Sequence, residues 1–175
     1  MASEIIVQTI KGPTSGANAN KIIIPSGQTL SAPGHVVQVV DRTGGARVTS
    51  GSTATWTPTN MDLSITPKFA NSKILVIGNQ PMRIYGTGVT VARGSQRIKR
   101  NVAGGSYTVI WNDAGHQEHI QTRTANSVTQ ELSHVVSWSV LDAPSYSLGD
   151  TLYYVPEGYV YGDTGVSQLI LWEGS

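Results

Sequence analysis

The sequence predicts an all-β protein: an antiparallel β-sandwich or jelly-roll-like head with a short N-terminal β arm that assembles with other copies of the chain. Two observations predict the β class. The apolar runs are short and rich in Val, Ile and Thr, and clusters of Gly, Pro, Ser and Asn bound them. No convincing helix interrupts this pattern, and many short strands at such spacing are typical of sandwiches and jelly rolls.

The first 33 residues form an extension with two expected strands, residues 3–10 and 21–24, around a turn or loop at residues 12–20. The second run stops at a Pro-Ser-Gly sequence that a helix could not cross. One copy offers these isolated strands few neighbours, and unpaired backbone groups are costly to bury. We therefore expect other copies to supply the neighbours. Residues 1–33 are predicted to be an attachment and oligomerisation arm.

The head is predicted to span residues 34–175 and to begin with strands at residues 35–40, 55–57 and 61–66. The third of these alternates, since apolar side chains occupy every second position. This alternation predicts a strand with one face on the core. A polar loop is expected at residues 41–53.

In the middle of the head, residues 74–77 form a continuous apolar run, which is typical of a strand covered on both faces. Residues 82–85 and 89–91 are expected strands, and the glycines between them predict a hairpin or a bulge. The basic run RGSQRIKR at residues 93–100 has two interpretations, a solvated loop or a patch for an anionic surface. The loop is favoured because short basic runs occur often by chance. The net charge of +1 gives no electrostatic footprint for nucleic acid.

The remaining expected strands continue to the C-terminus. The strongest is residues 135–141, where Val136, Trp138 and Val140 share one face, and Trp138 and Trp172 are expected in the core. The others are residues 106–111, 119–124, 129–132, 151–155, 159–161 and 168–172.

Composition restricts the function classes. Only 13% of the 175 residues are charged, against about 25% in an average globular protein. A neutral polar surface of this kind is common in β-rich extracellular and virion proteins. The absence of cysteine excludes disulfides and cysteine metal sites. No secretory signal is visible and no apolar run approaches the ~20 residues that span a bilayer, so we expect synthesis in a cytoplasm and no membrane insertion.

The sequence offers no complete catalytic, cofactor or metal constellation. The stretch His116–His119 (HQEH) lacks the spacing of a zinc site. Two of the acidic residues could in principle pair as in a glycosidase, but the sequence does not show which, and turn and cap roles explain most of them. The acidic residues considered are Asp41, Asp62, Asp113, Glu118, Glu131, Asp142, Asp150, Glu157 and Asp163. No phosphate loop or nucleophile elbow is present. We predict no enzyme activity, no metal and no cofactor.

Two groups of residues are candidates for surface recognition. Basic side chains of the RGSQRIKR run form the first group, and a tryptophan followed by a turn signal begins the second. The candidates are Arg97, Lys99, Arg100, Trp111, Asn112, Asp113 and His116.

Five segments carry a family resemblance in chain order. They are the opening MASEIIVQTIKGPTSGANANKIIIPSGQTL leading into PGHVVQVV, then MDLSITPKFANSKILVIGN, VTVARGSQRI, SWSVLDAPSYSLGDTLYY and the closing SQLILWEGS. Together they resemble small structural and fibre-tip proteins of tailed bacteriophages, especially phages of marine bacteria. The resemblance implies a homotrimeric β appendage on a virion. Residues 103–126 and 154–167 depart from the pattern and leave any ligand open.

Three functions follow as alternatives. The first is a tail-fibre or adhesin-like appendage that contacts a host surface glycan or receptor and joins other virion proteins through its arm. The second is a knob that decorates the capsid, and the resemblance does not decide between tail and capsid. The third is a glycan-cleaving depolymerase, which the modest chain length disfavours because a sugar groove normally needs a longer chain.

Overall fold

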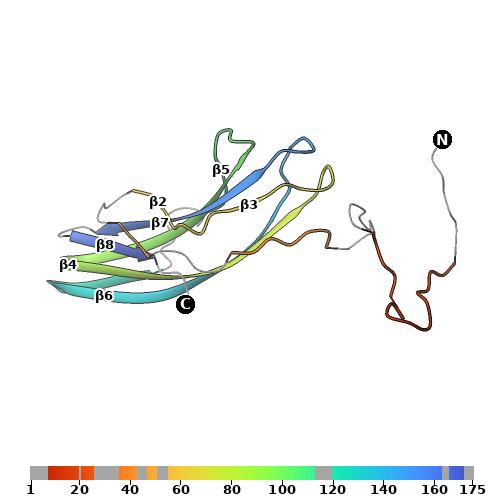
Figure 1. Cartoon of the computed structure of the whole chain (residues 1–175). Coiled ribbons are helices and arrows are strands. Elements are labelled where there is room, and N and C mark those ends of the chain that lie inside the picture. The colour runs from red at the N-terminus through yellow and green to blue at the C-terminus, as the bar shows by residue number, and fades with distance from the viewer. Residues whose placement is uncertain are drawn as a thin grey trace. The chain divides into compact units, whose positions relative to one another are not determined.

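The computed structural model describes residues 8–19, 21–25, 36–42, 47–50, 55–112, 120–162 and 166–171. The chain divides into two compact units, Met1–Val39 and Val40–Ser175. All strands of the described residues lie in the second unit, which is the head (Figure 1). Within the described part, no helix has the length and apolar character needed to cross a membrane.

Regular structure in the described residues consists of strands alone, which confirms the all-β prediction. The strands are β1 (Val48–Ser50), β2 (Thr57–Pro58), β3 (Leu63–Ile65), β4 (Ile74–Val102), β5 (Thr108–Asn112), β6 (Ile120–Asp142), β7 (Leu152–Gly162) and β8 (Val166–Leu171). Every pairing between them is antiparallel.

The organising element is β4, a strand of 29 residues that turns back on itself. If β4 were straight, Ile74 and Arg100 would lie about 85 Å apart at ~3.3 Å per residue. Yet Arg100 contacts Asp142, the residue paired with Ile74 on β6, at 3.1 Å. The two halves of β4 therefore face each other, and Figure 1 shows them as separate yellow-green and green runs.

Each half of β4 builds one layer. The first half pairs with β6 on one side and with β8 on the other, and β1 joins beyond β8. The second half pairs with β7 and β5, and β2 and β3 join beyond β7. The result is a sandwich-like head made by folding long antiparallel ribbons over one another.

The ribbon folds where its register slips. The pairing of β4 with β6 shifts between Gly86 and Val89 and again between Val89 and Val91. Such shifts mark bulges, which bend a strand and increase its twist. The predicted bulge at residues 86–88 is confirmed. The alternative hairpin is wrong because the strand continues through this segment.

The core lies between the two layers and follows the alternation of each strand. Met82 and Ile84 point inward from the first half of β4, and Ile98 from the second half. Trp138 on β6 covers Gly78 so closely that a Cβ there would lie 2.4 Å from the indole Cζ2. The prediction that Trp138 belongs to the core is confirmed, and Val136 is buried on the same face of β6. Trp172 lies outside the described residues.

Several expected strands merge. The runs expected at 119–124, 129–132 and 135–141 become the single strand β6, and two others become β7. Polar residues between short apolar runs suggest strand ends, but a paired strand tolerates Ser, Thr and Asn on its solvent face.

Four predictions are wrong. Residues 21–25 and 36–40 contain no strand, because a strand needs a pairing partner and the described residues offer them none. The loop expected at residues 41–53 contains the strand β1. The basic run at residues 93–100 is not a loop but part of β4. The apolar run at residues 74–77 is not covered on both faces, since Leu75 and Ile77 are 58% and 68% exposed.

Candidate recognition surface

The basic side chains in the second half of β4 lie on opposite faces of the strand. Ile98 is buried in the core, so its neighbours Arg97 and Lys99 point outward. Arg100, one position further, points inward again. Arg97 and Lys99, two residues of the first candidate group, therefore share the outer face of the layer that contains the second half of β4 and β7.

A buried carboxylate connects the two outward cations. Glu157 on β7, the register partner of Arg97, is 3% exposed. Its Oε2 accepts from Arg97 Nη2 at 2.6 Å, and its Oε1 accepts from Lys99 Nζ at 2.5 Å. Two cations thus share one carboxylate, and one positive charge is left in excess at this face.

Aromatic rings lie over these cations. The Arg97 guanidinium stacks on the ring of Trp56 at 4.3 Å from its centroid, and Trp56 in turn contacts Tyr159 at 5.1 Å between centroids. The Lys99 ammonium lies 4.2 Å from the ring centroid of Tyr107. Further along, Arg93 lies over Tyr161 at 5.9 Å. We call this set the cation–aromatic face: Trp56, Arg93, Arg97, Lys99, Tyr107, Glu157, Tyr159 and Tyr161.

The chemistry of this face suits binding rather than turnover. Aromatic rings offer apolar surface for the C–H face of a sugar, and neighbouring cations can pair with a carboxylate or sulfate group. Tyr107 and Tyr161 are 49% and 41% exposed and can meet a ligand. Both oxygens of Glu157 are held by cations, as in a structural ion pair. Within the described residues, no group of three His, Asp or Glu side chains could hold a metal ion.

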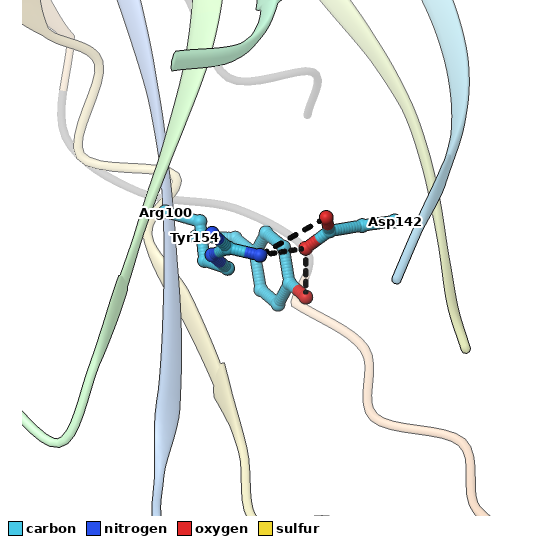
Figure 2. Close-up of polar contacts among 3 residues, drawn as sticks. All are labelled: Arg100, Asp142 and Tyr154. Carbon is cyan, nitrogen blue, oxygen red and sulfur yellow. Dashed lines mark hydrogen bonds and ion pairs between the residues drawn. The ribbon is translucent and has the colours of Figure 1, made fainter. Parts of the chain in front are cut away.

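Arg100 belongs to a different cluster, inside the head. Its Nη1 donates to both oxygens of Asp142 at 3.1 Å, and Tyr154 donates its hydroxyl to Asp142 Oδ2 at 2.8 Å. Figure 2 shows the three side chains converging from β4, β6 and β7. Because Asp142 comes from one layer and Arg100 from the other, the cluster ties the two layers together.

Burial raises the pKa of Tyr154 well above its usual range, and the hydrogen bond to Asp142 adds to this effect. A raised pKa means that the folded protein keeps the phenolic proton more strongly than the unfolded chain. The stabilisation is therefore fully present below pH ~10 and is lost as the pH rises further.

Tyr154→Phe is expected to make the free energy of unfolding depend less steeply on pH at alkaline pH. Between pH 10 and 12, Tyr154 adds a slope of up to ~1.4 kcal/mol per pH unit to the free energy of unfolding. Urea unfolding at several pH values measures this slope. Tyr161→Phe, which changes an exposed ring on the same strand, is the control. Equal slopes for wild type and Tyr154→Phe would contradict the assignment.

The second candidate group lies partly outside the described residues. Trp111 on β5 is half-buried and packs against Trp138, with 6.3 Å between the ring centroids. It therefore lies at the edge of the core and not at the tip of a loop. The backbone of Asn112 pairs with Arg97. Asp113 and His116 are outside the described residues.

Sequence reasoning missed most of the cation–aromatic face. It named Arg97 and Lys99 but not Trp56, Tyr107 or Tyr159. One available signal was the alternation in the run EGYVYG, which places Glu157, Tyr159 and Tyr161 on one face of a strand. Their meeting with β4 depends on the register between distant strands, which the sequence does not show.

Comparison with known proteins identifies no relative of the chain. No family model matches the chain, and neither a curated protein nor a solved structure matches it.

Proposed function

We propose that the chain is a non-enzymatic structural protein of a tailed phage virion, a homotrimeric tail-fibre or adhesin-like appendage whose head contacts the host surface. The observation that carries the proposal is the cation–aromatic face, which combines exposed rings with an excess positive charge. The ordered resemblance of five sequence segments to phage fibre-tip proteins supports it. The ligand class that fits this face is an anionic glycan.

Incorporation into particles tests the structural part of the proposal. Mass spectrometry of purified phage particles that carry the gene should detect the chain in the virion. Its absence from particles would overturn the proposal.

Tyr107→Ser is expected to weaken binding to the host surface about tenfold, which corresponds to ~1.4 kcal/mol. The exposed ring contributes stacking area without holding the buried Glu157, so the fold should be unaffected. The assay is the concentration of purified protein that blocks phage adsorption. Leu148→Ser, an exposed apolar side chain on the turn before β7, is the control. Equal blocking by both variants would contradict a role of this face.

Capsid decoration is the second candidate. A small head on an N-terminal arm also suits a knob that is attached to a shell. Copy number separates the two, since a capsid carries many more copies than a tail tip. Quantitative mass spectrometry against the major capsid protein gives this ratio.

A glycan-cleaving depolymerase has less support. The two carboxylates of the described residues that lie deepest, Asp142 and Glu157, are both engaged by cations. Release of reducing sugar from host polysaccharide, lost on a single Asp or Glu substitution, would favour this third function.

A further inference from the structure

Two amide side chains lie in the middle of the core without a hydrogen-bond partner. Gln80, on the first half of β4, is 0% exposed, and Gln96, on the second half, is 2% exposed. In the described part of the chain, neither the nitrogen nor the oxygen of either amide has a partner. Buried polar groups in folded proteins are nearly always hydrogen-bonded, either to the protein or to ordered water. These four atoms therefore require a partner that the described residues do not supply.

The two amides lie across the core from each other, one in each layer. Trp138 and Trp111 meet between the layers, with 6.3 Å between their ring centroids. Trp138 is the register partner of Gly78 in the first half of β4, and Trp111 is the register partner of Ile98 in the second half. Each glutamine occupies the next inward position from these partners toward the fold of β4. Both amides therefore belong to one level of the sandwich.

The indole nitrogen of Trp138 lies in the same part of the core. Among the described residues, it has no hydrogen-bond partner either. The indole covers Gly78, where a Cβ would lie 3.0 Å from Nε1. Gly78 and Gln80 are neighbouring inward positions of β4, ~6.6 Å apart along the strand. The indole N–H thus adds a donor beside the level of the two amides.

Glycines leave room at this level of the core. Alternation places Gly94 on the inward face of β4, beside Gln96, and Gly94 is buried. Gly158 on β7 is the register partner of Gln96 and is also buried. Neither glycine supplies a side chain to fill the space in front of its backbone. Polar atoms and space therefore occur together, which are the two conditions for an internal water.

The chemistry of these groups selects a small neutral molecule. The amides and the indole offer N–H donors and carbonyl acceptors, and none of them carries a charge. An anion would meet the carbonyl oxygens and a cation would meet the N–H groups, so each fits less well than a molecule that both donates and accepts. Water does both, and a buried water makes about three hydrogen bonds. Three side chains supply that number of partners.

We propose that the core of the head contains an internal water site formed by Gln80, Gln96 and Trp138. At least one long-lived water bridges the two amides and accepts a hydrogen bond from Trp138 Nε1. The site is separate from the cation–aromatic face and does not depend on the proposed function. It joins the two layers in the middle of the sandwich, as Arg100 and Asp142 join them where β4 ends and begins.

Relaxation dispersion of the water signal tests the site, because it counts the waters that stay bound longer than the protein takes to tumble. The full chain should hold at least one such water. The double variant Gln80→Leu with Gln96→Leu should hold fewer, since it removes both amides. Asn79→Leu, which changes an exposed neighbour on β4, is the matched control and should keep the wild-type number. An equal number in the double variant and wild type would overturn the inference.

A measurement on the unchanged protein decides the question even if the double variant fails to fold. The indole N–H signal of Trp138, identified by its loss in Trp138→Phe, should show a nuclear Overhauser cross-peak to water with the sign of a long-lived contact. A wild-type protein without this cross-peak has no water at the indole, and the proposed site would be wrong.

Unfolding equilibria test whether the two amides share the water. Gln80→Leu and Gln96→Leu should each raise the equilibrium constant of unfolding about tenfold, because each leaves the other amide with an incomplete set of partners. The double variant removes the bridged pair as a whole, so its effect should fall well below the hundredfold product of the two single effects. Effects that multiply fully would show that the amides are independent, and this would contradict a bridging water.

Discussion

Arg100→Met is expected to lower the free energy of unfolding by about 3 kcal/mol, because it leaves the Asp142 carboxylate without its cation. The side chains of Arg100 and Asp142 are only 15% and 10% exposed, so water replaces the lost partner poorly. The hydroxyl of Tyr154 remains as the other donor to the carboxylate. Chemical denaturation at a fixed protein concentration measures the difference.

Two further variants separate the loss of charge pairing from the loss of packing. Arg100→Met combined with Asp142→Asn removes both charges and keeps an oxygen acceptor for Tyr154, so most of the lost stability should return. Arg42→Met breaks the exposed pair with Asp62, whose atoms are 3.7 Å apart, and should cost no more than ~0.5 kcal/mol. A cost for Arg100→Met as small as that for Arg42→Met would show that the cluster is solvated.

The β class of the head was predictable because the alternation of a strand is local. Ile65 faces the core as its spacing predicts, and so do Val136 and Trp138. The fold-back of β4 was not predictable in the same way. It depends on which distant strands pair on either side of Gly86, and that pairing is decided by the whole sheet.

The candidate site was predictable only in part, for the same reason. The basic run indicated a positive surface. As a loop, it would place Arg97, Lys99 and Arg100 together as candidates for surface recognition. On a strand, alternation sends Arg100 to the interior and leaves the other two outside. Trp56 reaches Arg97 across a long sequence interval, which no local pattern could indicate.

Deletion of residues 1–33 is expected to abolish incorporation of the protein into virions while the head keeps its fold. The head forms a compact unit with its own core between two layers, and the core residues found in the described part of the chain all come from the head. Circular dichroism should therefore still report β structure. Western blots of purified particles should lose the protein.

A subtler variant identifies the part of the arm that acts. Ile22→Ser, Ile23→Ser and Ile24→Ser together keep the length of the arm but remove its exposed apolar side chains, and incorporation should fall as in the deletion. Ala17→Ser with Asn18→Ser changes the neighbouring turn and should leave incorporation unchanged. Since exposed Ile side chains in an isolated arm stabilise nothing, an effect of the triple change requires that these side chains be buried in the particle. Normal incorporation of the deletion variant would instead place the attachment site in the head. This result would contradict the proposal that the arm attaches the protein to the virion.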